Sequence, residues 1–200
     1  IHIIERGGAD LMLAGGAESK VNPVGLAEYE ILGMLSRSAD SNPSKVYRPL
    51  DADSDGFVVG EASGFLVLEE WEHAEKRGAK IYAEVLGFGA SSRSGRETAM
   101  RTALEEAKVS PEELNYLEAS GLGIPAEDQA EAEAIEKIWN DESQELLVSA
   151  SKAVTGFTGF SAGALDLIIS SLAVSRELIP PALNFNHLKH PRKFQVVKST

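Results

Sequence analysis

The stretch from Arg48 to Gly64 reads RPLDADSDGFVVGEASG and leads an acidic turn directly into an apolar segment. Its three alternating aspartates, followed by glycine, are typical of the first half of a calcium-binding loop. The bidentate acid that closes such a loop would fall at Ala62, whereas Glu61 lies one residue early. The pattern therefore favours an acidic turn that enters a strand at residues 64–68 over a calcium site.

The composition limits the class of protein. Of the 200 residues, 43% are hydrophobic, which is enough for one sizeable core or for a large piece of a bigger fold. The absence of cysteine excludes a disulfide or a cysteine nucleophile within these residues. The formal charge of −12 argues against nucleic-acid binding, because no basic stripe exists to neutralise phosphates. The densest basic segment, residues 189–193, is interpreted as a solvated surface.

Localisation is inferred from what the sequence lacks. No apolar run approaches the roughly 20 residues that span a bilayer, and the opening residues 1–6, IHIIER, lack the layout of a signal peptide. We therefore expect a cytoplasmic protein without a membrane span. Because Ile1 begins inside a helical pattern and a strand pattern at residues 194–197 ends just before Thr200, we also expect a piece of a longer protein.

Short apolar segments alternate with helical patterns along the chain. The predicted strands are residues 9–14, 64–68, 81–87, 114–119, 146–149 and 194–197. The predicted helices are residues 24–35, 69–77, 99–107, 128–139 and 162–176. We expect the first strand to stop at Gly15-Gly16 and the last helix to be buried on most sides. The alternation predicts an α/β fold with a largely buried sheet.

A glycine-rich segment offers one alternative. Residues 121–126, GLGIPA, follow a predicted strand and open toward a helix, as a dinucleotide-binding fingerprint does. However, Pro125 removes an amide where a pyrophosphate needs donors, and Glu127 and Asp128 place negative charge beside it. A dinucleotide-binding α/β enzyme is therefore the weaker alternative.

Several segments, in one order, resemble the β-ketoacyl synthase (ketosynthase) family. They are ADLMLAGGAE at residues 9–18, the Arg48–Gly64 stretch, LVLEEWEHAEKRGAKIYAEV at 66–85, SKAVTG at 151–156 and IPPALN at 179–184. The resemblance runs from about Ile1 to Thr200. It implies a thiolase-like layered αβαβα fold, of which this chain covers the middle and C-terminal part. Residues 1–90 would end the N-terminal thiolase-like half, and residues 91–200 would form a C-terminal half that is incomplete at its end.

The resemblance also implies a chemistry that can be checked by position. A ketosynthase moves an acyl chain onto a cysteine and decarboxylates a malonyl-type extender, and two histidines stabilise the charge that develops on the thioester oxygen. The family pattern His-Gly-Thr-Gly-Thr-Pro corresponds to residues 120–125, which puts Ser120 at the first histidine. Phe157 falls at the second. Phenylalanine donates no hydrogen bond and the serine hydroxyl is short and neutral, so both catalytic donors are predicted to be lost.

Other site positions follow from the same resemblance. Leu122 and Ile124 replace two threonines that contact the phosphopantetheine arm of an acyl carrier protein. Phe160 replaces a glycine and would narrow the acyl pocket. Lys152 keeps the family lysine, and Asp166 replaces the glutamate that pairs with it. We interpret Lys152 and Asp166 as a buried ion pair that holds two helices whether or not chemistry occurs; no metal and no cofactor beyond that arm are implied.

The leading hypothesis is a catalytically degenerate ketosynthase-family protein of fatty acid or polyketide biosynthesis that resembles a chain-length factor. Such a protein is inactive alone and forms a homodimer, or a heterodimer with an active ketosynthase, that meets acyl carrier protein. One alternative is an acyltransferase of altered chemistry that uses a cysteine upstream of these residues. Another is a structural or interaction protein that no longer meets acyl carriers.

Overall fold

The structure, a computed structural model, describes residues 1–39, 42–92, 95–139 and 145–198. The strands are β1 (Leu11–Glu18), β2 (Ala62–Glu69), β3 (Tyr116–Glu118), β4 (Leu147–Ser149) and β5 (Gln195–Val196). The α-helices are α1 (His2–Glu5), α2 (Pro23–Ile31), α3 (Trp71–Lys76), α4 (Gly95–Ala107), α5 (Pro125–Ile138), α6 (Lys152–Thr155) and α7 (Ala162–Arg176). The 3₁₀ turns are η1 (Pro43–Lys45), η2 (Pro111–Glu113) and η3 (Gly159–Ser161).

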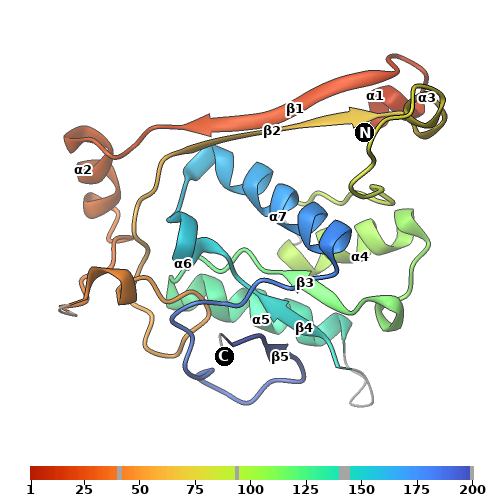
Figure 1. The fold of residues 1–200 in the computed structure, drawn as a ribbon. Helices are drawn as coiled ribbons and strands as arrows, with labels where there is room; N and C mark the ends of the chain where they lie inside the picture. Colours follow the sequence, from red (N-terminus) through yellow and green to blue (C-terminus); the bar gives the residue numbers. More distant parts are fainter. Residues whose placement is uncertain (40–41, 93–94, 140–144, 199–200) are drawn as a thin grey trace.

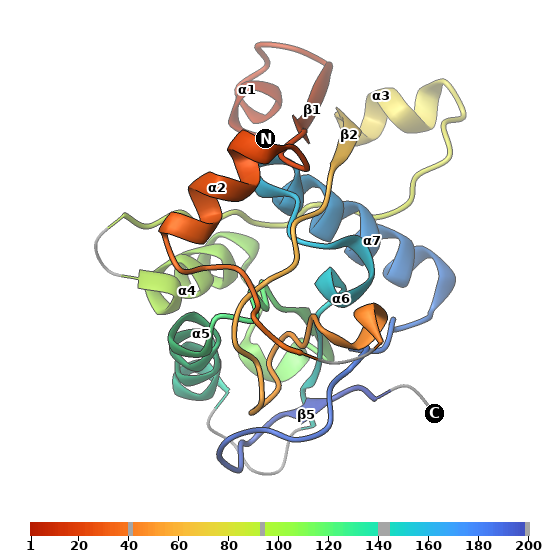
Figure 2. The ribbon, with the colours of Figure 1, turned by 90° about the vertical axis from the view of Figure 1, so that its left-hand side faces the viewer.

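The strands form two separate sheets. β1 and β2 pair antiparallel along their whole length, with Leu11 opposite Glu69 and Glu18 opposite Ala62. β3, β4 and β5 form a parallel sheet in that order. α7 lies between the two sheets, and α5 lies on the far side of the three-stranded sheet (Figures 1 and 2). The chain therefore has successive β, α, β and α layers.

The best-packed region lies between α5 and the three-stranded sheet. Ile135 of α5, Val148 of β4 and Ala119 are fully buried in one apolar cluster. Trp139 closes this cluster at the end of α5, where its indole Nε1 donates a hydrogen bond to the Pro111 carbonyl at 2.8 Å. The pairing satisfies the one polar atom of this large side chain, so the residue is accommodated in the core.

The two-stranded sheet is packed on one face only. Its inner face rests on α7 (Figure 1), whereas Leu13, Phe65 and Val67 on its outer face are 64%, 55% and 58% exposed. Beside β2 runs a groove of 720 Å³, which is also lined by residues 79–85 and by Trp71. Within the described ranges, no helix has both the length and the apolarity to cross a membrane.

The first strand is longer than the sequence predicts. It passes through Gly15 and Gly16 to Glu18 and does not stop at these glycines. A Cβ atom at Gly15 would lie 2.1 Å from the carbonyl oxygen of Gly64, and one at Gly16 would lie 2.4 Å from that of Phe160. The glycines are therefore positions of close backbone approach within a strand and not a stop signal.

Two further predictions are wrong. Residues 81–87 form no strand in the structure. Residues 81–85 instead line the groove, and Gly87 packs against α4, where a Cβ atom on this glycine would lie 2.3 Å from the Ala103 carbonyl oxygen. The bounds of α7 are those predicted, but the helix is not buried on most sides. Leu167 and Val174 are 41% and 63% exposed, because one side of α7 lines the groove and another faces solvent.

Candidate functional site

The loop that carries Ser120 is fixed by a buried carboxylate of α5. Glu131, which is 5% exposed, accepts hydrogen bonds from the backbone amides of Ser120 and Gly121 at 2.7 and 2.9 Å. The hydrogen bonds go to the backbone of Ser120, so they do not depend on which side chain stands at this position. Glu131 thus preserves the course of the chain at the predicted first-histidine position.

A second buried carboxylate, one turn earlier on α5, continues this support. Asp128 accepts hydrogen bonds from the amides of Leu122 and Gly123 at 2.7 and 3.0 Å. Its other contact reaches the Arg48–Gly64 stretch, where the amide of Leu50 donates to it at 2.7 Å. Burial raises the pKa of Asp128 to about 6, against the lowering effect of these backbone hydrogen bonds.

The two carboxylates bear on the dinucleotide alternative. A pyrophosphate at a glycine-rich loop is bound by backbone amides that point toward it. Here the four consecutive amides of residues 120–123 already donate to Glu131 and Asp128. These four amides are therefore not free for a phosphate, and the dinucleotide alternative is set aside.

An aromatic cluster surrounds the predicted second-histidine position. The ring of Phe157 lies 4.4 Å from that of Phe57 and 6.0 Å from that of Tyr29, measured between centroids. Tyr29 and Phe57 meet edge to face at 5.1 Å. These are the separations of favourable aromatic pairs. The position where the family would hold a hydrogen-bond donor is thus packed among apolar rings.

The segment Gly56–Gly60 joins the two positions. The Gly56 amide donates to the Gly123 carbonyl at 2.8 Å, beside the first position, and the Gly60 amide donates to the Phe157 carbonyl at 2.9 Å. A Cβ atom at Gly60 would lie 2.3 Å from the Thr155 carbonyl oxygen. This segment therefore fixes the position of the Ser120 loop relative to Phe157.

The aspartates of the acidic turn serve neighbouring loops. Asp51 is buried and accepts hydrogen bonds from the amides of Asn186 and His187 at 2.6 and 3.1 Å. Asp55 instead accepts hydrogen bonds from a different segment, from the Ser36 hydroxyl and, at 3.0 Å, from the Arg37 amide. Because Asp55 is directed away from Asp51, the three aspartates together do not ring one cation as a calcium loop does.

Lys152 and Asp166 form an ion pair between α6 and α7. Lys152 Nζ lies 2.7 Å from Asp166 Oδ2, with the lysine side chain 2% exposed and the aspartate side chain 25% exposed. Burial raises the pKa of Asp166, and the Lys152 ammonium opposes that rise. The pair connects the helix next to Phe157 with the helix that separates the sheets.

The remaining predicted site residues lie in different surroundings. Leu122 lies beside Tyr47, whose hydroxyl donates to the Leu122 carbonyl at 3.2 Å, and Ile124 precedes the first turn of α5. Phe160 is 86% exposed, and its narrowing of an acyl pocket stays a prediction. Its backbone is pinned to β1, where the Phe160 amide donates to the Glu18 carboxylate at 3.1 Å.

Sequence reasoning missed three supporting side chains. Tyr47 is buried, which raises the pKa of its hydroxyl, and it holds the loop at Leu122. Glu118 accepts a hydrogen bond from the Ser151 amide at 2.8 Å and so places the residue before Lys152. Tyr29 comes from a helix far from Phe157 in sequence. No local pattern marks these contacts, because each joins segments that only the fold brings together.

The chain matches two domains of one protein family. Residues 74–186 match the family described as "Beta-ketoacyl synthase, C-terminal domain", and residues 1–74 match its N-terminal domain. The chain belongs to the β-ketoacyl synthase family. The two matches meet at residue 74, and the division predicted near residue 90 stays a prediction.

Individual ketosynthase relatives support the same conclusion. The 3-oxoacyl-[acyl-carrier-protein] synthase 2 of Vibrio cholerae is 40% identical over 92% of this chain and 47% of its own length. The solved structure titled "The ishigamide ketosynthase/chain length factor" superposes with a TM-score of 0.86 at 34% identity, over 98% of this chain and 49% of that one.

A third match is a type II polyketide acyl-carrier protein in complex with its ketosynthase, with a TM-score of 0.89 and 29% identity over 95% of this chain and 49% of that one. The thiolase-like ketosynthase fold predicted from the sequence is thereby confirmed. The chain spans about half the length of the curated relatives it matches.

Proposed function

We propose that this chain belongs to a subunit of fatty acid or polyketide biosynthesis that has lost condensation activity and pairs, as a chain-length factor does, with an active ketosynthase. The observation that carries the proposal is the aromatic cluster at Phe157. Three rings occupy the neighbourhood in which the family places a donor, and Ser120 stands at the other donor position. Loss of one such donor typically costs about 100- to 1000-fold in rate.

The contacts that hold the site in place are retained, which argues that the chain has not degenerated as a whole. Glu131 and Asp128 still hold the Ser120 loop, and Lys152 still pairs with Asp166. A protein that keeps the backbone geometry but lacks the donors is suited to shape an acyl tunnel next to an active partner. The likeness to a ketosynthase/chain length factor structure, and to a ketosynthase bound to its acyl-carrier protein, supports these two partners.

The test compares the full-length protein alone and in the presence of a candidate active ketosynthase. Incubated alone with malonyl- and acyl-thioesters, the protein should decarboxylate no malonyl group and carry no acyl adduct by mass spectrometry. Together with the partner, it should change the length of the product relative to the partner alone. Robust decarboxylation or condensation by the protein alone would overturn the proposal, and an acyl adduct would favour an acyltransferase that uses an upstream cysteine.

A restoring variant sharpens this test. Ser120→His with Phe157→His returns imidazole donors to both positions, and the carboxylates under the loop remain in place. If the donors are what is missing, malonyl decarboxylation should rise above that of the wild type. The control is Ser120→His alone, which should restore little because the second position stays aromatic.

A further inference from the structure

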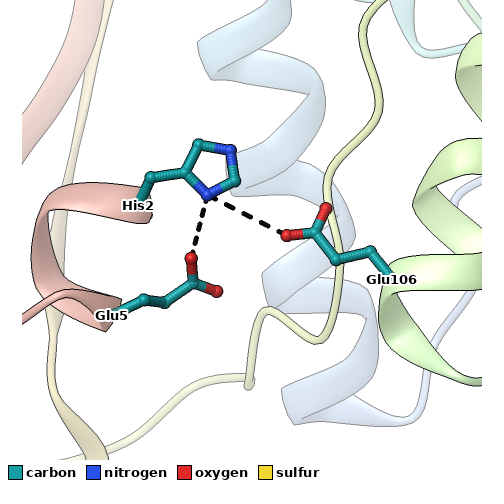
Figure 3. Close-up of side chains that lie close together, drawn as sticks. All are labelled: His2, Glu5 and Glu106. Atoms are coloured by element: carbon teal, nitrogen blue, oxygen red, sulfur yellow. Dashed lines mark hydrogen bonds and ion pairs between the residues drawn. The ribbon is translucent and has the colours of Figure 1, made fainter.

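A group of metal-binding side chains meets where α1 approaches α4, away from the ketosynthase site (Figure 3). His2 and Glu5 come from α1, and Glu106 comes from the last turn of α4. His2 Nδ1 lies 2.9 Å from Glu5 Oε2 and 4.0 Å from Glu106 Oε1. All three donor atoms lie within 4.8 Å of one another. They are side chains from two elements far apart in sequence, brought together by the fold.

The spacing suits a small divalent cation. Zinc binds imidazole nitrogen and carboxylate oxygen at about 2.0–2.2 Å, so two donors on one tetrahedral ion stand about 3.3–3.5 Å apart. The two separations from His2 Nδ1, 2.9 and 4.0 Å, lie on either side of this value. Small rotations of exposed side chains therefore suffice to bring all three donors to bonding distance.

Phe88 fixes part of the arrangement from outside. Its backbone amide donates to Glu106 Oε2 at 2.9 Å, which leaves Oε1 of the same carboxylate directed at His2 (Figure 3). The ring of Phe88 meets the His2 imidazole edge to face at 6.0 Å. Metal ligands are commonly oriented by such outer contacts, which reduce the freedom that binding would otherwise remove.

The charges of the group are unbalanced without a cation. A single imidazole nitrogen can donate to only one acceptor, and Glu5 at 2.9 Å occupies that role. Glu106 then directs a second carboxylate oxygen toward the same nitrogen from 4.0 Å. Glu5 and Glu106 bring two carboxylates together in a chain whose net charge is −12. A divalent ion accepts electron pairs from all three groups and cancels this charge.

We infer that His2, Glu5 and Glu106 bind one divalent transition-metal ion, for which zinc is the best chemical match, with water completing the coordination. The bound ion fastens α1 to α4. This site is independent of the proposed chain-length role, because its residues lie outside the Ser120–Phe157 region.

The test is a calorimetric titration of the full-length protein with zinc chloride. We expect one zinc per chain. His2→Ala and Glu106→Gln should each weaken binding by more than about tenfold, because even outer-shell changes typically cost 10- to 100-fold.

Matched controls separate the outcomes. Glu106→Gln keeps an oxygen for the Phe88 amide, so its circular dichroism spectrum should match the wild type, and His190→Ala removes another exposed histidine without changing affinity. Unchanged affinity in both His2→Ala and Glu106→Gln would overturn the inference. So would loss of binding in Asp53→Asn, which would assign the ion to the Asp51, Asp53 and His187 cluster.

Discussion

At Ser120 the backbone is held by the buried carboxylates of α5, whereas at Phe157 the side chain itself is the structural element, packed among Phe57 and Tyr29. The structure at the first position therefore does not depend on its side chain, whereas the packing at the second position does. A fold can lose a catalytic group at no structural cost where backbone contacts carry the geometry. Where an apolar ring is itself packed among other rings, its replacement by a polar side chain disturbs that packing.

The largest loss of stability is expected from Asp128→Ala, which removes an acceptor that holds the Ser120 loop. It leaves the amides of Leu50, Leu122 and Gly123 without their acceptor, and each buried unsatisfied group costs about 1–3 kcal/mol. We expect the free energy of unfolding to fall by about 3–4 kcal/mol, measured by urea denaturation. Glu127→Ala, its exposed neighbour, is the control and should change it by less than about 1 kcal/mol. Equal effects would mean that the loop does not depend on Asp128.

The pH dependence of stability tests the same carboxylate. Burial raises the pKa of Asp128 to about 6 from an ordinary value of 3.8, so the folded state binds this proton more tightly than the unfolded state. Its stabilising contribution is therefore fully present below about pH 4 and is lost as pH rises through about 6, by up to about 3 kcal/mol. Asp166, whose pKa is also raised, acts in the same direction.

The measurement is a denaturation series from pH 4.5 to 7. The decline with pH should be shallower in Asp128→Asn, which cannot titrate. Below this window Glu69 works in the opposite sense, because hydrogen bonds from Arg77 and His73 hold its pKa at about 2. A wild-type curve that is flat or rising across the window, and parallel to that of the variant, would contradict the role given to Asp128.

Lys152→Met tests the ion pair that survives beside the aromatic cluster. The variant leaves Asp166 without its cation, and loss of one partner of a buried pair costs about 3–5 kcal/mol. Because Asp166 is a quarter exposed, we expect a smaller loss of about 2–3 kcal/mol in unfolding free energy. The double variant Lys152→Met, Asp166→Leu should recover most of it. Failure to recover would mean that the pair contributes more than mutual neutralisation.

Phe157→Ala removes the central ring of the cluster. Fully buried phenylalanines cost about 3–5 kcal/mol on this change, and Phe157 is only half-buried, so we expect about 2 kcal/mol. Phe157→Leu, which keeps apolar volume, should cost about 1 kcal/mol through the lost aromatic contacts. Thermal denaturation distinguishes the two. If neither variant lowered the stability, contacts among the three rings would not stabilise the fold.

The smallest effect is expected at Ser120. Because Glu131 binds the backbone amide and not the hydroxyl, Ser120→Ala should change the free energy of unfolding by less than about 0.5 kcal/mol. Chemical denaturation alongside Phe157→Ala makes the contrast direct. If Ser120→Ala proved the more damaging of the two, the distinction between the two positions would fail.

Whether a feature could be predicted from the sequence depends on how far apart its contacting residues lie along the chain. The bounds of α7 follow from local periodicity. The packing of Phe157 on Tyr29 does not, because α2 reaches it only through the tertiary fold. The same holds for Asp128 and Glu131, which hold the loop that precedes their own helix.

The strand predicted at residues 81–87 fails for a related reason. An apolar run identifies a strand only if another strand is present to pair with it, and this segment instead borders the groove. By contrast, the glycines of β1 mislead because glycine has two uses. Read locally they terminate a strand, but the approach of Gly16 to the Phe160 backbone shows that they permit contact across layers.

The placement of the two tryptophans has a practical consequence. Trp139 is enclosed in the core against α5, at 6% exposure, whereas Trp71 is 44% exposed at the rim of the groove. An indole emits at shorter wavelength in an apolar enclosure than in water, so the two residues are separate fluorescent reporters. With Trp71→Phe, the remaining emission follows the melting of the three-stranded layer alone; with Trp139→Phe, it follows the solvent and any quencher admitted beside β2.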